Sequence, residues 1–310
     1  MKKNTMRFAT FLALIAALFS GTNNFLTKIA VTVSKDPIFY TTLKNALVAV
    51  FLVGLFIAFR KSSELRGLTR KQYGMLAAIG IIGGSVPFAL FFTGLTMTSA
   101  LSAGLIHKTL FLWVILFAYP FLKERLSTGQ LVGVVAIFIS NLFIGGFTGF
   151  QFNLGELLVL LATILWAIEN IIAKKILADV SSMTVAGVRM TLGSIILLAF
   201  LVVSGRFTPL TDLSMIQWGW TIATSVLLLG YVLTWYTSLK YAPATYVAAL
   251  LVPATVVTNV LSAVFVTHTW STMQGLSAFF AMLGAVLLIY YGMRATKAAT
   301  FSSHTHVQHS

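Results

Sequence analysis

The feature that most constrains this chain is a series of long apolar stretches that occurs twice along its 310 residues. A membrane-spanning helix needs about 20 apolar residues. Ten stretches of this kind are predicted, at 8–30, 37–59, 73–95, 99–122, 128–147, 154–177, 182–204, 215–239, 243–267 and 272–293. Because the connections between them are short, the sequence predicts one bundle of helices within a membrane.

The second group of five stretches repeats the first. Segment 19–28, FSGTNNFLTK, aligns with segment 165–174, LWAIENIIAK, and segment 92–110 aligns with segment 236–254. Because five is odd, two such halves cross the bilayer in opposite directions, which is the plan of many secondary transporters. The predicted fold is an all-α integral membrane protein with ten transmembrane helices in two inverted five-helix repeats, at 1–150 and 151–296, followed by a disordered cytoplasmic tail at 297–310.

Composition and charge agree with a membrane location. Hydrophobic residues make up 58% of the chain and charged residues 9%, too apolar a balance for a soluble domain. A net charge of +14 would suggest nucleic acid as a partner in a soluble protein, but here the basic residues gather in alternate loops, and the other loops hold only Lys28, Lys35 and Arg206. The positive-inside rule then places both termini in the cytoplasm. We expect a multi-pass protein of a prokaryotic cell (inner) membrane, with the lipid bilayer and no nucleic acid as its partner.

Three segments carry a resemblance to a known family: GTNNFLTKIA at 21–30, LWAIENIIAKK at 165–175, and AYPFLKERLSTGQLVGVVAIFISNLFIG at 118–145. They resemble the EamA-type members of the drug/metabolite transporter superfamily, in which an LxERL turn joins the fourth and fifth helices and recurs between the ninth and tenth. Here the second copy reads VTHTWST, with His268 and Thr269 in place of Glu124 and Arg125. The resemblance implies a transporter fold and leaves the substrate open, because such transporters include exporters of amino acids and other metabolites.

Charged residues within the predicted helices are the first candidates for a site, because a charge at the bilayer centre costs about 2.5–3.5 kcal/mol. Lys44, Lys108 and Arg189 are the basic residues placed there, and Glu169 is the acid most clearly inside a helix. Lys44 and Arg189 occupy nearly equivalent positions of the two repeats. They either anchor or pair helices, or face a central cavity and attract a carboxylate or phosphate.

Lys108 lies about ten residues into its predicted helix, too deep for its side chain to reach either surface easily. We therefore expect it to line a water-accessible cavity, with a buried structural ion pair as the alternative. The neighbouring His107 is either a hydrogen-bond donor to another helix or a residue suited to proton coupling.

Trp166, Glu169 and Asn170 follow helical spacing, so they lie on one face of the sixth helix. Asn24 belongs to a comparable polar stripe on the first helix, its repeat partner. Amide side chains also hold helices together, so these positions are either packing residues or part of a binding site. Glu169 either neutralises Lys108 or Arg189, binds a substrate ammonium, or carries a proton.

Tyr231 and Trp235 lie one turn apart on the eighth helix, where they either stack on a substrate or merely pack against lipid and other helices. The chain has no cysteine, which excludes thiolate metal sites, and no metal or cofactor is predicted.

Three classes of function fit a helical membrane protein of this kind. An intramembrane enzyme would need convergent catalytic groups, and a retinal-type receptor built around Lys108 would need a seven-helix plan. A transporter accounts for the repeat and for the charged interior together. We expect a secondary transporter that moves a small polar metabolite across the membrane by alternating access. Export of an amino acid or related zwitterion is the first expectation. The alternative is a carrier of organic or phosphorylated anions, and protons are a candidate coupling ion.

Overall fold

The structure, a computed structural model, describes residues 3–34, 36–59, 62–143, 149–208 and 210–307. Within these residues the chain is helical and has no strand. The helices are α1 Lys3–Ser34, α2 Pro37–Ala58, α3 Ser62–Arg66, α4 Arg70–Ile82, α5 Val86–Leu95, α6 Ala100–Lys108, α7 Leu110–Leu122, α8 Thr128–Leu142, α9 Leu154–Ile176, α10 Ser182–Val203, η1 Leu210–Asp212, α11 Met215–Tyr241, α12 Ala244–Leu250, α13 Ala254–Ser262, η2 Ala263–Thr267 and α14 Thr272–Val307.

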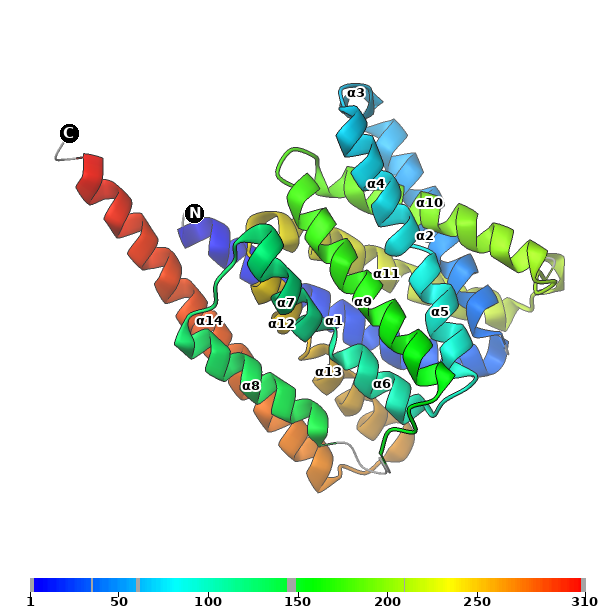
Figure 1. Cartoon of the computed structure of the whole chain (residues 1–310). Coiled ribbons are helices and arrows are strands. Elements are labelled where there is room, and N and C mark those ends of the chain that lie inside the picture. The colour runs from blue at the N-terminus through cyan, green and yellow to red at the C-terminus, as the bar shows by residue number, and fades with distance from the viewer. Residues whose placement is uncertain (1–2, 35, 60–61, 144–148, 209, 308–310) are drawn as a thin grey trace.

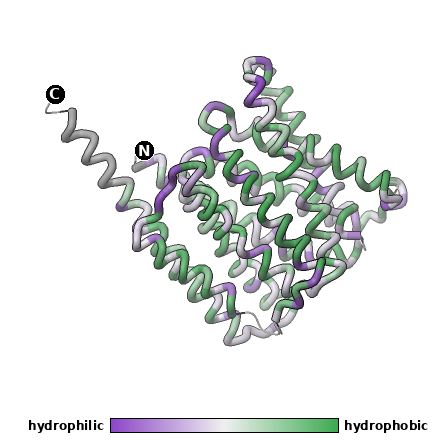
Figure 2. The backbone as a smooth tube through the Cα atoms, viewed as in Figure 1, coloured by the Kyte–Doolittle hydropathy of each residue, from purple (hydrophilic) through white to green (hydrophobic). Residues whose placement is uncertain are grey.

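In the part of the chain that the structure describes, nine helical segments are long and apolar enough to cross a membrane. The fifth predicted span, 128–147, appears as α8, which has 15 residues. At 1.5 Å per residue such a helix covers roughly 22 Å, less than the ~30 Å hydrocarbon core. Positions 144–148 lie outside the described residues, so the count of ten stays a prediction. Apolar residues dominate the middle of the helices, and hydrophilic ones gather mainly near their ends (Figure 2).

Some spans consist of two consecutive helices. The break between α4 and α5 falls at Gly83 and Gly84, and the break after α12 falls just before Pro253. Glycine and proline weaken or remove helical hydrogen bonds at these points. A third break, between α6 and α7, has no proline. There the Thr109 hydroxyl donates to the Ile106 carbonyl at 2.6 Å and competes with the helical hydrogen bonds.

The helices pack in pairs that correspond between the two halves of the chain. α1 packs along α11, and α9 packs along α5 in the same way. α2 crosses α10, and α8 lies beside α14 at one edge of the bundle (Figure 1). If the two halves of the chain are exchanged, the pair α1–α11 becomes the pair α9–α5. The pairs α2–α10 and α8–α14 each become themselves.

Helix starts repeat as well. Thr69 and Ser214 cap α4 and α11, and Ser127 and Ser271 begin α8 and α14. Each hydroxyl accepts a hydrogen bond from the backbone N–H of a glutamine three residues later, and that glutamine's side chain accepts from the capping residue's N–H. These reciprocal caps satisfy N–H groups that a helix start leaves unpaired.

The contacts of α1 with α11 and of α5 with α9 use small residues. A Cβ on Gly94 of α5 would lie 2.6 Å from the Gly155 carbonyl oxygen of α9, so neither glycine can be replaced without separating the helices. At the corresponding crossing of α1 and α11, Ser238 donates to the Ala9 carbonyl oxygen at 2.9 Å. Small residues allow this close approach of backbones in lipid.

Two ends of the bundle are distinguished by the loops that meet there. Where α1 begins, the Glu124 carboxylate accepts from the N–H groups of Ala244 at 2.8 Å and Thr245 at 2.9 Å, and so caps α12. At the opposite end, the Asn153 side chain donates to the Met97 carbonyl at 3.3 Å. We call these the inner end and the outer end, after the orientation expected from the loop charges.

The segment expected to be a disordered tail, 297–310, is described as far as Val307. Up to that residue it continues α14, and 308–310 lie outside the described residues. The end of this helix projects past the rest of the bundle (Figure 1). Residues 295–299, ATKAA, include strong helix formers, which favours continuation of the hydrogen-bonded helix.

Candidate functional site

A cavity of about 420 Å³ lies between helices of both halves. Every site residue predicted from the sequence, except Lys108, lines it: Asn24, Lys44, His107, Trp166, Glu169, Asn170, Arg189, Tyr231 and Trp235. A cavity of this size fits a small metabolite.

Lys108 is the exception. It is the last residue of α6 and half-buried, and it is not among the residues that line the cavity. Successive residues of a helix point about 100° apart, and here His107 takes the direction toward the cavity. The structure therefore places the expected cavity lysine of this helix outside the lining.

The cavity is built from matching positions of the two halves. The pairs related by the repeat are Ser20 with Trp166, Asn23 with Glu169, Asn24 with Asn170, Phe91 with Trp235, Phe92 with Tyr236, and His107 with Leu251. Both members of each pair line the cavity, and in every pair except Asn24 with Asn170 their side chains differ.

Glu169 is the acid of the cavity, and its side chain is engaged by two neighbours. Tyr236 donates its hydroxyl to Glu169 Oε1 at 2.5 Å, and Arg189 Nε lies 3.9 Å from the same oxygen. The guanidinium offsets the carboxylate charge in a site where only 2% of Glu169 is exposed. Tyr236 was not predicted from the sequence as a site residue, because Trp235 was the candidate and its neighbour in a helix points about 100° away.

The carbonyl of Gly83, at the break between α4 and α5, binds two of the predicted site residues. It accepts from Arg189 Nη2 at 2.9 Å and from Trp166 Nε1 at 3.1 Å. A Cβ at Gly83 would lie 2.4 Å from Glu169 Cγ, so the break brings bare backbone against the acid. No pattern in the sequence indicates this role of Gly83.

Lys44 is a buried cation of a different kind. Only 6% of the residue is exposed, and its ammonium donates to the Thr27 hydroxyl at 3.3 Å and lies 5.7 Å from the centre of the Tyr40 ring. Among the described residues it forms no ion pair with a carboxylate. A buried charge without a counterion is costly, so Lys44 makes this side of the cavity attractive to an anion.

Aromatic rings form one wall of the cavity. The Trp166 ring centre lies 5.2 Å from that of Phe88, 5.8 Å from that of Phe91 and 5.0 Å from that of His107. Tyr231 and Trp235 stack on each other with centres 5.9 Å apart. Such surfaces bind the apolar or cationic part of a ligand.

Besides Arg189 Nε, which is paired with Glu169, two buried polar atoms of the lining have no hydrogen-bond partner within the described residues. These are Nδ1 of His107 and Oδ1 of Asn170, whose Nδ2 is already bonded to the Trp166 carbonyl. Buried polar atoms are rarely left unpaired in proteins, so both are available to a ligand.

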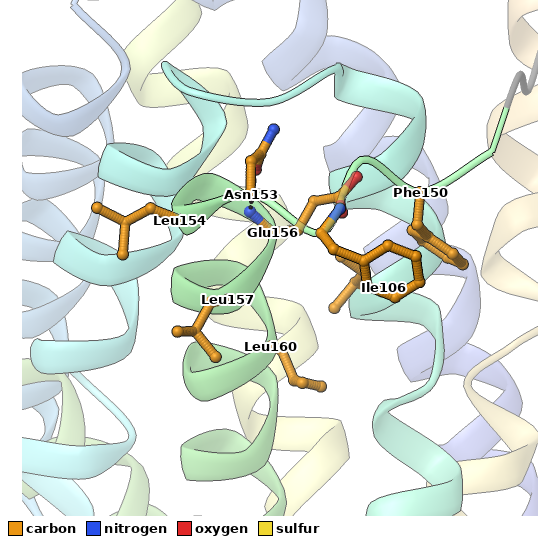
Figure 3. Close-up of a pocket in the computed structure, with 8 residues that line it drawn as sticks. Ile106, Phe150, Asn153, Leu154, Glu156, Leu157 and Leu160 are labelled. Atoms are coloured by element: carbon orange, nitrogen blue, oxygen red, sulfur yellow. Dashed lines mark hydrogen bonds between the residues drawn. The ribbon is translucent and has the colours of Figure 1, made fainter.

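A second hollow, of about 390 Å³, lies between α6 and α9 near the outer end (Figure 3). Its walls are mostly apolar, with Ile106, Phe150 and Leu160 around it. The carboxylate of Glu156 accepts from backbone N–H groups, among them that of Phe152 at 2.7 Å. This hollow lacks the unpaired polar atoms of the central cavity, which is therefore the better candidate site.

Comparison with known families decides the class of protein. The model of the EamA-like transporter family matches residues 7–146 and again 153–290. The chain belongs to the EamA-like transporter family. The two matches together cover most of the chain, in agreement with the resemblance seen in the sequence.

Curated relatives of this EamA-family protein are similar along much of its length. A transporter of Bacillus subtilis, named uncharacterized transporter YvbV, is 25% identical over 305 residues, which cover 94% of each chain. An uncharacterized transporter of the archaeon Methanothermobacter thermautotrophicus is 24% identical over 239 residues, 75% of this chain and 69% of the relative. These relatives support a transporter and name no substrate.

A solved crystal structure has the same fold. It superimposes with a TM-score of 0.76 at 18% identity, over 93% of this chain and 98% of the other. At this identity the likeness concerns the fold alone.

Proposed function

We propose that this transporter moves a small carboxylate-bearing metabolite by alternating access, and that an amino acid or related zwitterion, carried outward, is its first substrate class. The observation that carries the proposal is Lys44, a buried ammonium without an acidic partner in the described part of the chain, which faces a metabolite-sized cavity. A substrate carboxylate is the counterion that this charge needs.

The proposed membrane arrangement is two inverted five-helix repeats, at 1–150 and 151–296, with both termini in the cytoplasm of a prokaryote. The reciprocal packing of α1 with α11 and of α9 with α5 supports the repeats. The basic loops at 60–71 and 123–125 support the orientation.

For a zwitterion, Lys44 binds the carboxylate and the opposite pole of the cavity binds the ammonium. The unpaired Oδ1 of Asn170 accepts one N–H, and the nearby Glu169 adds negative charge. The ring of Trp166 packs against the apolar part of the solute.

One observation favours the alternative class, organic or phosphorylated anions. Glu169 already lies against Arg189 and Tyr236, so the cavity has an excess of positive charge from Lys44. A simple anion would need no partner for an ammonium.

The experiment is counterflow in proteoliposomes that contain the purified protein and a labelled amino acid. Each competitor amino acid is matched with its 2-hydroxy acid, which keeps the carboxylate and lacks the ammonium. Stronger competition by the amino acids supports the zwitterion, and stronger competition by the hydroxy acids supports the anion. Without saturable flux of either class, the proposal fails.

A further inference from the structure

Lys174, near the end of α9, holds the end of α11. Its ammonium donates to the carbonyl oxygens of Leu239 at 2.7 Å, Lys240 at 3.3 Å and Ala242 at 2.7 Å. The last carbonyls of a helix lack partners and carry partial negative charge. One lysine therefore joins α9 to α11 at the inner end, below the central cavity.

The repeat provides the same chemistry at the outer end, where the contact is not made. Lys174 aligns with Lys28 of α1, and the three carbonyls align with those of Leu95, Thr96 and Thr98 at the end of α5. Lys28 is exposed, and within the described residues no hydrogen bond joins it to α5. Nor do α1 and α5 pack together as α9 and α11 do.

The cavity shows the same difference between the two ends. Thr27 lines the cavity, whereas its counterpart Ala173 is fully buried in the core. Asn45 also lines the cavity, whereas its counterpart Met190 does not line it and packs in the hydrophobic core. The cavity thus extends toward the end where the lysine contact is open and stops at the end where it is closed.

We infer that Lys174 and Lys28 are positioning residues that close the inner and the outer end in turn. In inverted-repeat transporters, alternating access rocks one repeat against the other around a fixed site, and the matching chemistry of the two halves allows the contact made at one end to form at the other. Lys28 then donates to the carbonyls at the end of α5 while Lys174 releases α11. This exchange rests on the alternating access proposed above, and each lysine biases a two-state equilibrium toward the side that it closes.

Two matched reporters test the exchange in the full chain, which has no native cysteine. Thr27→Cys reports the outer side and Ala173→Cys reports the inner side. We expect a membrane-impermeant maleimide to label Thr27→Cys from outside and to label Ala173→Cys slowly in inside-out vesicles. Adding Lys174→Met should speed labelling at Ala173→Cys at least tenfold and slow it at Thr27→Cys.

Lys28→Met should act in the opposite direction. Added to Lys174→Met, it should restore labelling at both reporters toward the original rates, because each change removes one of two opposed contacts. Lys175→Met is the matched control, since Lys175 is exposed, lies 5.4 Å from the Phe121 ring centre and does not reach α11 by any described hydrogen bond. It should leave both rates unchanged.

A crosslink keeps the inference testable if Lys174→Met does not fold. Cysteines in place of Lys28 and Thr96 should be joined by a short bifunctional thiol reagent in the native Lys174 background, because these positions meet in the state in which the outer end is closed. Unchanged reporter rates in a folded Lys174→Met protein, or no crosslink, would overturn the exchange. Labelling needs no substrate, so a failed flux assay with switching reporters would contradict only the substrate proposal.

Discussion

Arg189 and Glu169 face each other across the boundary of α10 and α9, with Nε and Oε1 separated by 3.9 Å. The pair sits at the wall of the cavity and is completed by the hydroxyl of Tyr236 and the carbonyl of Gly83. Two opposite charges that share a cavity wall reduce each other's cost of burial, and each becomes costly when its partner is removed.

The first prediction concerns this pair. Arg189→Met alone and Glu169→Gln alone should each lower thermal stability, because each leaves a charge without its partner, at a cost of about 3–5 kcal/mol. The double variant should recover most of the loss. Thermal unfolding of the detergent-purified proteins measures this, and purely additive losses would show that the two residues do not depend on each other.

The second prediction separates two lysines. Lys44→Met should weaken binding of the carboxylate substrate more than tenfold, about 1.4 kcal/mol, because it removes the unpaired cation of the cavity. Lys108→Met removes an equal charge from a residue outside the lining, so substrate affinity should remain close to the original. Equilibrium binding to the purified protein measures both. A large loss of affinity in Lys108→Met with none in Lys44→Met would contradict this prediction. It would support the expectation from the sequence that Lys108 lines the cavity.

The third prediction uses two glycines of the same span. Gly83→Ala should destabilise the protein by about 1–3 kcal/mol, as overpacking does, because the new Cβ would lie 2.4 Å from Glu169 Cγ and 2.6 Å from the Ile79 carbonyl oxygen. Gly74→Ala is the control, since nothing lies within 4 Å of its added Cβ. There we expect no loss, and a gain of up to ~1 kcal/mol from helix propensity. Equal stabilities of the two variants would contradict the close packing at Gly83.

The fourth prediction concerns orientation. A cysteine at the exposed position Ser63, in α3, should be labelled only after the membrane is opened, and a cysteine at the exposed position Thr211, in η1, should be labelled on intact cells. An impermeant maleimide measures both. The reverse pattern would place the termini outside and exchange the inner and outer ends.

Much of the site could be predicted because membrane burial makes polar residues conspicuous. Glu169 and Arg189 stand out in apolar helices, and helical spacing puts Trp166 and Asn170 on the face of Glu169. The internal repeat then indicates which helices meet. Polar side chains within spans are conspicuous in the sequence whichever way they point.

The sequence does not show in which direction a side chain of a helix points. His107 and Lys108 are neighbours, and only the rotation of α6 decides which of them lines the cavity. Gly83 acts through its carbonyl, and no side-chain pattern reveals an acceptor made by a break between helices. The length of α8 was also missed, because hydropathy indicates an apolar stretch and does not fix where the helix ends.

The two halves place different side chains at matching positions of the cavity, and this difference bears on which enantiomer of a chiral substrate the cavity accepts. Asn23 is the repeat counterpart of Glu169, and His107 is the repeat counterpart of Leu251. The two halves therefore present different side chains to a molecule in the cavity. Under the proposed function, Lys44, Asn170 and the Trp166 ring offer the substrate three non-equivalent contacts. Three such contacts suffice to tell a chiral molecule from its mirror image, so a protein assembled from two related halves is equipped for stereoselective transport.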